Sequence, residues 1–248
     1  NKMTDAANYA EAVLANSSFS LASTAMDFSK NWVAGSSSPE IIFAYVNNSR
    51  ASSPLNFTLY VNDTYCSWNY APSDWCYNSL FADDNTLSRK GDVRLKATFT
   101  SQDANRVIKY PNGTYQLAET SDYTCTPVVI SRISEMYLIK AEALGKTNGA
   151  AALVEYMKKR YTTAPSEAAI KALSDKEYQT LILDERRREF YAEGMRWQDI
   201  KRTNRLELLE TLDGRTYLMY YPIPQDEIDM AGTVAYPQNP GYAGYTGN

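Results

Sequence analysis

Residues 183–202 read L-D-E-R-R-R-E-F-Y-A-E-G-M-R-W-Q-D-I-K-R, and this run decides the fold. Five positions recur at steps of seven, four, three and four, which places them on one face of a helix with 3.6 residues per turn: Leu183, Phe190, Gly194, Trp197 and Lys201. Gly194 costs such a helix about 1 kcal/mol relative to Ala. We therefore interpret it as a junction where the backbone bends or another element packs closely, and we expect Trp197 to be buried.

Charged residues fill the positions between these five. Glu185 and Arg188 are three apart, as are Glu193 and Arg196, and Asp184 lies four before Arg188. Side chains at these separations face each other on a helix surface. Taken alone, the pattern favours a solvated helix whose charges pair along its own length.

The same run resembles the signature of the SusD/RagB family, the surface glycan-binding lipoproteins of starch-utilisation-type systems. That signature is E-R-R-x-E-[aromatic]-x-x-E-G-x-R-W-x-D-[aliphatic]-K-R, and residues 185–202 fit it at nearly every position. Upstream, residues 131–144 (S-R-I-S-E-M-Y-L-I-K-A-E-A-L) are similar to the family's R-x-x-E-x-x-L-x-x-A-E-A helix. Downstream, residues 221–228 (Y-P-I-P-Q-D-E-I) and 238–242 (Q-N-P-G-Y) are similar to its closing segment. In the family the signature element is structural, so we expect no catalytic or phosphate site in it.

The resemblance implies a mainly α fold, a helical-repeat (TPR-like) α/α superhelix of the SusD type with an irregular C-terminal tail. We expect residues 1–248 to form a single SusD/RagB-like domain with a loop-rich aromatic insert at residues 47–125. The insert has no sustained helical period, and residues 91–95 (G-D-V-R-L) resemble the D-x-R element that ends it in the family. The family's proteins are longer and begin with a lipoprotein signal, so the chain is expected to be a C-terminal portion.

Local patterns predict individual elements around the signature. The apolar run at residues 40–46 fits a short strand or a buried helix segment, and periodicity does not choose between them. Residues 93–100 alternate as a strand does, and Asn112-Gly113 is a candidate hairpin turn. Helices are predicted from about residue 133 to 144, ended by Gly145, from 149 to near 161, from a cap at Ser174 or Asp175 to Gly194, and from 195 to about 203. In the irregular tail, Asn239-Pro240-Gly241 suits a type II turn.

The best candidate binding segment is Tyr65 to Asn78, Y-C-S-W-N-Y-A-P-S-D-W-C-Y-N. Sugars have apolar C–H faces rimmed by hydroxyls, so a binding site needs flat aromatic rings with amides and carboxylates at their edges. The candidate ring residues are Tyr65, Trp68, Tyr70, Trp75 and Tyr77, and the candidate edge residues are Asn69, Asp74 and Asn78. The alternative is that these aromatic residues fill a small local core beneath the insert.

The three cysteines leave two alternatives open. Cys66 and Cys76 bracket part of this segment, so they could form a local disulfide in an oxidising compartment. They could equally be two buried free thiols. Cys125 has no evident partner in either case.

Composition excludes several functions. The chain has no histidine, which removes Ser-His-Asp and Cys-His catalysis. The net charge of −4 argues against a nucleic-acid partner. No apolar run approaches the roughly 20 residues that a membrane span needs. We expect no enzyme activity, cofactor or metal.

The resemblance implies non-catalytic binding of a glycan or other nutrient at the outer-membrane surface. The oligosaccharide or polysaccharide would be delivered to a TonB-dependent, SusC-like outer-membrane transporter. The full-length protein would be lipid-anchored on the outer surface of the cell outer membrane, with the anchor absent from this chain. The alternative is a helical scaffold or protein-interaction module without a sugar site.

Overall fold

The computed structural model describes residues 2–33, 38–46, 72–99, 107–110, 127–209, 212, 214–231 and 236–243. The chain divides into two compact units, residues 1–193 and residues 194–248. The described residues are mainly helical, as the sequence predicts. No helix among them is long and apolar enough to cross a membrane.

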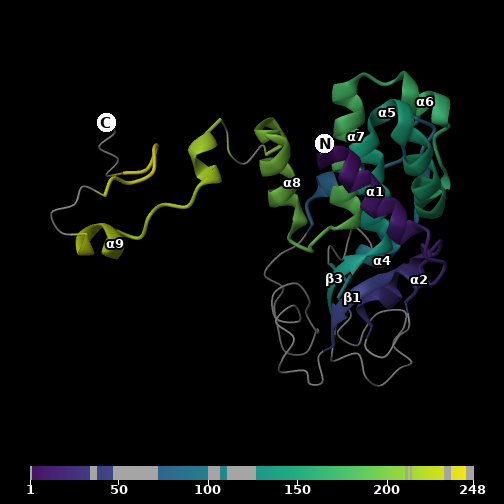
Figure 1. The fold of residues 1–248 in the computed structure, drawn as a ribbon, viewed down its shortest axis with the longest axis horizontal. Helices are drawn as coiled ribbons and strands as arrows, with labels where there is room; N and C mark the ends of the chain where they lie inside the picture. The colour runs from purple at the N-terminus through teal and green to yellow at the C-terminus, as the bar shows by residue number, and fades with distance from the viewer. Residues whose placement is uncertain are drawn as a thin grey trace. The chain divides into compact units, whose positions relative to one another are not determined.

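In the first unit, long helices pack together and short strands lie at one end (Figure 1). Helices α1 (Lys2–Leu14), α5 (Ile133–Arg160) and α7 (Asp175–Glu189) are the larger helices, and α6 (Glu167–Ala172) is a short helix between α5 and α7. The shorter helices are α2 (Ala25–Ser29), the 3₁₀ turn η1 (Lys30–Trp32), the π-helical turn η3 (Cys76–Leu80) and α4 (Val93–Thr98). The strands are β1 (Ile41–Tyr45), β2 (Lys90–Asp92), β3 (Val128–Arg132) and β4 (Tyr161–Thr163).

Helix α5 is the centre of this unit, and α1, α6 and α7 all pack against it. It contains both of the helices predicted between residues 133 and 161, joined through Gly145 at φ 67°. With ψ at 174°, this residue occupies a positive-φ region of backbone space that is open essentially only to glycine. Leu138, Ala141 and Leu153 are buried in the core of the unit.

Helix α7 begins at a capping box and ends before Gly194. The Ser174 hydroxyl accepts from the Glu177 N–H, and the Glu177 carboxylate accepts from the Ser174 N–H, which completes a capping box. The helix ends at Glu189 rather than running to Gly194. Gly194, at φ 80°, then begins the next helix, and a Cβ there would meet nothing within 4 Å. Of the two alternatives at this glycine, a bend or a close packing contact, the bend is therefore confirmed.

Residues 40–46 form a strand rather than a helix segment. Strand β1 pairs antiparallel with β3, and Ile41 lies opposite Arg132. Strand β2 pairs antiparallel with β4. The β2–β4 ribbon holds the start of α4 near the end of α5, because Asp92 lies opposite Tyr161 where α4 begins and α5 has just ended.

The strand predicted at residues 93–100 is wrong, because residues 93–98 form α4. The Asp92 carboxylate accepts from the Arg94 N–H and caps the helix. Arg94, Ala97 and Thr98 are buried at the three- and four-residue spacing of a helix. The apparent alternation in the sequence therefore reflects a short capped helix with one buried face. The hairpin turn predicted at Asn112-Gly113 lies outside the described residues.

The second unit contains α8 (Met195–Thr203), the 3₁₀ turns η4 (Leu206–Leu208) and η6 (Thr216–Met219), and α9 (Gln225–Met230). Ile200, Leu212 and Met219 form its small core, with Trp197 packed against them. Trp197 is only half-buried, so the predicted burial is wrong. The helix break at residues 190–194 ends the face that Trp197 was predicted to share with Leu183. In the tail, Gly241 has φ 90° and the Tyr242 N–H donates to the Asn239 carbonyl, which fits the predicted turn.

Candidate functional site

The signature helix α7 is not a solvated helix. Glu185 and Glu189 are fully buried, and Arg186 and Arg188 are nearly so. The predicted pair within the helix exists, with Arg188 donating to Glu185 at 2.7 Å. Most partners of these charges nonetheless come from other elements, which spacing within one helix does not reveal.

Glu189 is the centre of this buried charge network. One carboxylate oxygen accepts from Arg132 at 2.6 Å and from Arg160 at 2.9 Å. The other accepts from the Tyr156 hydroxyl at 2.8 Å and from Arg160 Nε at 2.9 Å. Burial alone would raise the pKa of Glu189, but the charges of Arg160 and Arg132 hold it well below its usual range.

Arg94, from the D-x-R element, joins α4 to α7. Its guanidinium binds Asp92 through two hydrogen bonds, at 2.9 and 2.7 Å, and reaches Glu185 at 2.9 Å. The Tyr161 hydroxyl donates to Glu185 at 2.6 Å. Burial opposes the charge on Glu185, but Arg188 and Arg94 together lower its pKa to about 2. The D-x-R element is therefore a structural clamp.

Two further residues extend the network, and sequence analysis did not single them out. Glu40 accepts from Arg160 at 2.7 Å and from the Ala22 N–H at 2.7 Å, which ties β1 and the α1–α2 connection to the end of α5. Lys109 donates to the Glu189 and Tyr191 carbonyls and to Glu193, and its ammonium lies 4.5 Å from the centre of the Trp32 ring. Glu40 follows Pro39 at the start of an apolar run, where a lone carboxylate is itself a sign of a buried partner.

The network is structural rather than catalytic. Its guanidiniums and carboxylates pair with each other and with tyrosine hydroxyls, and nearly all of the side chains involved are closed to solvent. In the part of the chain that the structure describes, no group of three or more acidic or cysteine side chains is arranged to hold a metal ion. Breaking one partner out of such a buried network costs about 3–5 kcal/mol, because it leaves an uncompensated charge.

The predicted binding segment is described only from Pro72 onward, so Tyr65, Trp68, Asn69 and Tyr70 lie outside the described residues. Asp74, Trp75 and Asn78 are exposed on the first turns of helix after Pro72. The Trp75 side chain is 40% exposed, and the guanidinium carbon of Arg187 lies 4.3 Å from the centre of its ring. Trp75 thus has one face held by a cation from α7 and the rest of the ring partly open to solvent.

Tyr77 and Cys76 point the other way, into a small core. Tyr77 is half-buried, with its ring 5.3 Å from that of Phe99. Burial raises the pKa of Tyr77. Cys76 is a buried free thiol whose sulfur lies 3.5 Å from the Tyr191 hydroxyl, and Cys66, its candidate disulfide partner, lies outside the described residues. The two alternatives for this segment, a binding surface and a local core, therefore apply to different residues. Cys76 and Tyr77 pack inward, whereas Trp75 remains at the surface.

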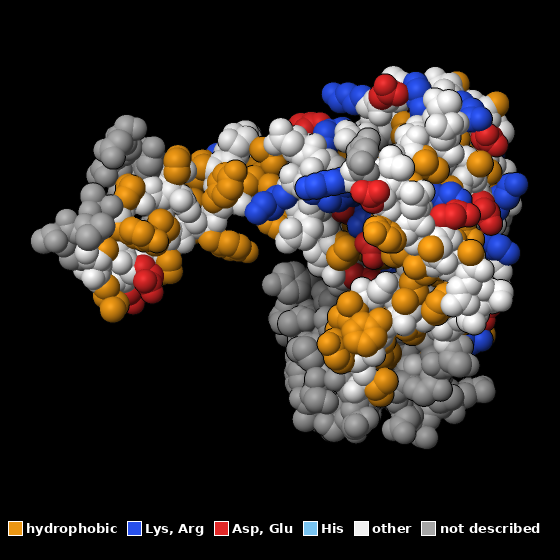
Figure 2. All heavy atoms as spheres, in the orientation of Figure 1, with side chains coloured by type: hydrophobic (Ala, Val, Ile, Leu, Met, Phe, Trp, Pro, Cys, Tyr) orange, Lys and Arg blue, Asp and Glu red, His pale blue; other side chains and the backbone are white. Residues whose placement is uncertain are grey.

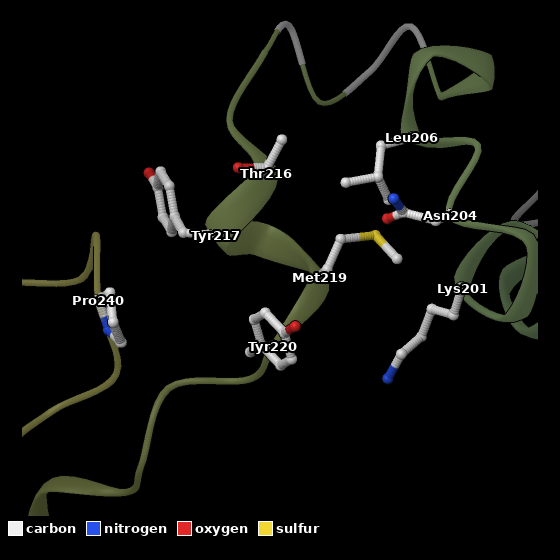
Figure 3. A pocket seen from close by; sticks show the side chains of 8 residues that line it. All are labelled: Lys201, Asn204, Leu206, Thr216, Tyr217, Met219, Tyr220 and Pro240. Atoms are coloured by element: carbon white, nitrogen blue, oxygen red, sulfur yellow. The ribbon is translucent and has the colours of Figure 1, made fainter.

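A separate pocket lies within the second unit, in the tyrosine-rich tail (Figure 3). Its volume is about 390 Å³. The described residues that line it are Lys201, Asn204, Leu206, Thr216, Tyr217, Met219, Tyr220 and Pro240. Sequence analysis did not select these residues; the signal for them was the density of tyrosine and proline between residues 217 and 242.

The family model described as SusD family matches residues 57–215. "SusD-like protein P38" of Formosa agariphila is 30% identical over 148 residues, which cover 54% of this chain and 29% of that protein. A SusD superfamily protein from Bacteroides thetaiotaomicron superposes with a TM-score of 0.66 at 24% identity, covering 96% of this chain and 57% of that one. Surface glycan-binding protein A from the same species superposes with a TM-score of 0.67 at 21% identity, covering 97% and 59%.

This mainly α fold, with a charge network buried beneath its signature helix, is the SusD fold, and the chain belongs to the SusD family. The family predicted from residues 185–202 and their flanking motifs is confirmed. The chain spans about a third to three-fifths of the length of these relatives.

Proposed function

We propose that this chain binds a glycan without chemically altering it, with Trp75 as an aromatic platform of the binding surface. The observation that carries the proposal is the environment of this ring. It is 40% exposed, it is held from one side by Arg187, and it has the exposed polar side chains of Asp74 and Asn78 beside it in sequence. An aromatic face with polar groups near its edge suits a sugar ring.

Membership of the SusD family supports the same function, since one structural relative is named a surface glycan-binding protein. The rest of the proposal follows the family. The protein would present its glycan at the outer surface of the outer membrane, lipid-anchored, and deliver it to a TonB-dependent SusC-like transporter. On the face drawn in Figure 2, acidic and basic side chains are interspersed over the first unit, so that face presents no large area of a single charge sign.

Isothermal titration with a panel of oligosaccharides tests the proposal. Trp75→Ala should abolish or strongly weaken the response to any sugar that binds the wild type. It should leave the melting temperature nearly unchanged, because a partly exposed ring contributes little to stability. Tyr9→Ala is a matched control, since Tyr9 is a 75% exposed aromatic residue on α1. If the folded Trp75→Ala variant bound the sugar as tightly as the wild type, Trp75 would not be part of the binding site.

A second candidate is a protein-interaction module without a sugar site. It is favoured by the exposed aromatic pair on β1, Phe43 and Tyr45, whose ring centres lie 5.1 Å apart, and by exposed Ile130 on the paired strand β3. Exposed apolar clusters of this kind are typical of protein-binding surfaces. A flat response to the whole sugar panel would favour this candidate over glycan binding.

A further inference from the structure

The pocket of the second unit is built by the closing segment of the chain. The Gln238 side chain acts as a strand partner for Ile223, accepting from its N–H at 2.7 Å and donating to its carbonyl at 2.8 Å. The Asn239 amide donates to the Tyr221 carbonyl at 2.8 Å, and the Tyr242 hydroxyl donates to the Tyr220 carbonyl at 2.5 Å. Residues 238–242 are thus held side by side with residues 220–223.

This attachment fixes one wall of the pocket. The Tyr217 ring meets the Tyr242 ring edge to face, with centres 5.1 Å apart. A Cβ added at Gly241 would lie 2.3 Å from Tyr217 Cγ, so the backbone of the turn rests directly on the ring. Pro240 and Tyr217 lie on the same side of the pocket in Figure 3. The Tyr217 ring is therefore immobilised before any ligand arrives, which lowers the entropic cost of binding.

Of the three polar side chains, Lys201 and Asn204 lie on the opposite side of the pocket, and Thr216 lies beside Tyr217 (Figure 3). Lys201 comes from α8 and Asn204 from its end, while Thr216 begins η6 (Figure 3). Among the residues described, none of these three side chains makes a hydrogen bond, and Lys201 is the sole charged side chain lining the pocket. Its ammonium lies 5.9 Å from the centre of the Tyr220 ring. The pocket therefore offers a cation, an amide and a hydroxyl together with the apolar side chains of Met219 and Leu206.

We propose that this pocket binds a monosaccharide unit that carries a carboxylate, a hexuronic acid, at a site distinct from Trp75. The tyrosine rings suit the C–H face of a sugar, and the amide and hydroxyl suit its ring hydroxyls. The ammonium of Lys201 pairs with the carboxylate. A volume of about 390 Å³ lies within the range of small-ligand sites. The inference goes beyond the proposed function, because it concerns different residues and a charged sugar.

Methionine methyl NMR of the full chain tests the inference at the pocket itself. Met219 is 5% exposed and lines the pocket, and Met219→Leu identifies its signal. Titration with D-glucuronic acid at low ionic strength should shift this signal saturably. D-glucose should bind at least about tenfold more weakly, because it lacks the carboxylate. Met157, fully buried in α5, should not respond to either sugar.

Lys201→Gln should bring the affinities for the two sugars within about twofold of each other. Lys176→Gln makes the same charge change at an exposed position on α7 and should preserve the difference. An unmoved Met219 signal, or equal affinity for the two sugars in the wild type, would overturn the inference. An equal shift with acetate would show carboxylate capture without sugar recognition and would also overturn it. The Trp75→Ala variant separates the two proposals, since it should leave the Met219 response intact even where it abolishes binding at the platform.

Discussion

Arg160 and Glu189 lie at the ends of α5 and α7 and meet in a two-point ion pair. Arg160 Nε and Nη2 each lie 2.9 Å from a different oxygen of the Glu189 carboxylate, and both side chains are fully buried. Such fork-to-fork pairs fix direction as well as distance. The pair therefore sets how the last turn of one helix lies against the last turn of the other.

Glu189→Gln should destabilise the protein by about 3–5 kcal/mol. The amide keeps the shape of the side chain but removes the negative charge shared by Arg94, Arg132 and Arg160. Urea denaturation followed by circular dichroism measures the loss. Glu155→Gln is the control, because Glu155 is exposed on α5 and accepts only a 3.3 Å bond from Tyr137 among described residues. Equal stability of the two variants would mean that the network contributes specificity without stability.

Acid should unfold the protein through the same network. The pKa of Glu185 is about 2 in the fold against 4.5 for the free group, so its stabilising effect is complete above pH 4.5. Between pH 4.5 and 2 the unfolded chain binds a proton that the folded chain does not, so stability falls as the pH falls, by at most about 3 kcal/mol from this group.

Melting temperatures at pH 7, 4.5 and 3 should show this loss in the wild type. Glu185→Gln should be less stable at pH 7 and should show a shallower decline below pH 4.5, since one titrating group is gone. If the melting temperature of Glu185→Gln fell as steeply below pH 4.5 as that of the wild type, the acid sensitivity would arise from other carboxylates, of which Glu189 is the first candidate.

Sequence patterns predicted several helix boundaries, but they did not predict which residues pair with the buried charges. Local signals sufficed for the Ser174 cap, the helix end at Gly145, the bend at Gly194 and the helix of residues 195–203, because each depends on neighbouring residues. The network could not be predicted, since Arg94 and Glu185 are 91 residues apart and helical spacing reports only local pairs. The strand predicted at residues 93–100 failed because a capping aspartate outweighed a weak alternation.

The candidate binding segment, residues 65–78, likewise shows what sequence patterns do not reveal. Composition identified the cluster of aromatic residues but not the direction in which each side chain points. Trp75 remains at the surface, whereas Cys76 and Tyr77 pack toward Phe99 and Tyr191. Neighbouring residues on a helical turn necessarily face different ways, so no single assignment could hold for the whole segment.

Two glycines of α5 should respond differently to alanine. A Cβ at Gly149 would lie 2.2 Å from the Ala141 carbonyl oxygen and 2.9 Å from the Tyr178 hydroxyl, which itself donates to that carbonyl. Gly145→Ala would meet nothing within 4 Å and would suffer only the strain of φ 67°. We expect Gly149→Ala to be the more destabilising by thermal melting, because backbone must move to admit the methyl group. The reverse order would show that the kink at Gly145 matters more than the close contact.

The last prediction concerns how α7 supports the binding platform. The Arg187 guanidinium lies 4.3 Å from the centre of the Trp75 ring and is half-buried, so it restrains the ring from one side. Cation–π contacts at such sites contribute about 0.5–2 kcal/mol. Arg187→Met should keep the packing of the aliphatic chain, release the ring and weaken glycan binding by about threefold to tenfold. A shift in tryptophan fluorescence should accompany the loss.

A double-mutant cycle distinguishes this positioning role from a direct contact between Arg187 and the sugar. If Arg187 acts through Trp75, Arg187→Met should have no further effect on affinity in the Trp75→Ala background, provided that weak residual binding remains measurable by NMR. Additive losses would instead mean that the guanidinium touches the ligand itself. Lys158→Met, a comparable loss of an exposed cation on α5, controls for the change in net charge and should leave affinity unchanged. The cycle thus tests whether Arg187, on the outward face of the charge-rich signature helix, supports the proposed glycan platform at Trp75.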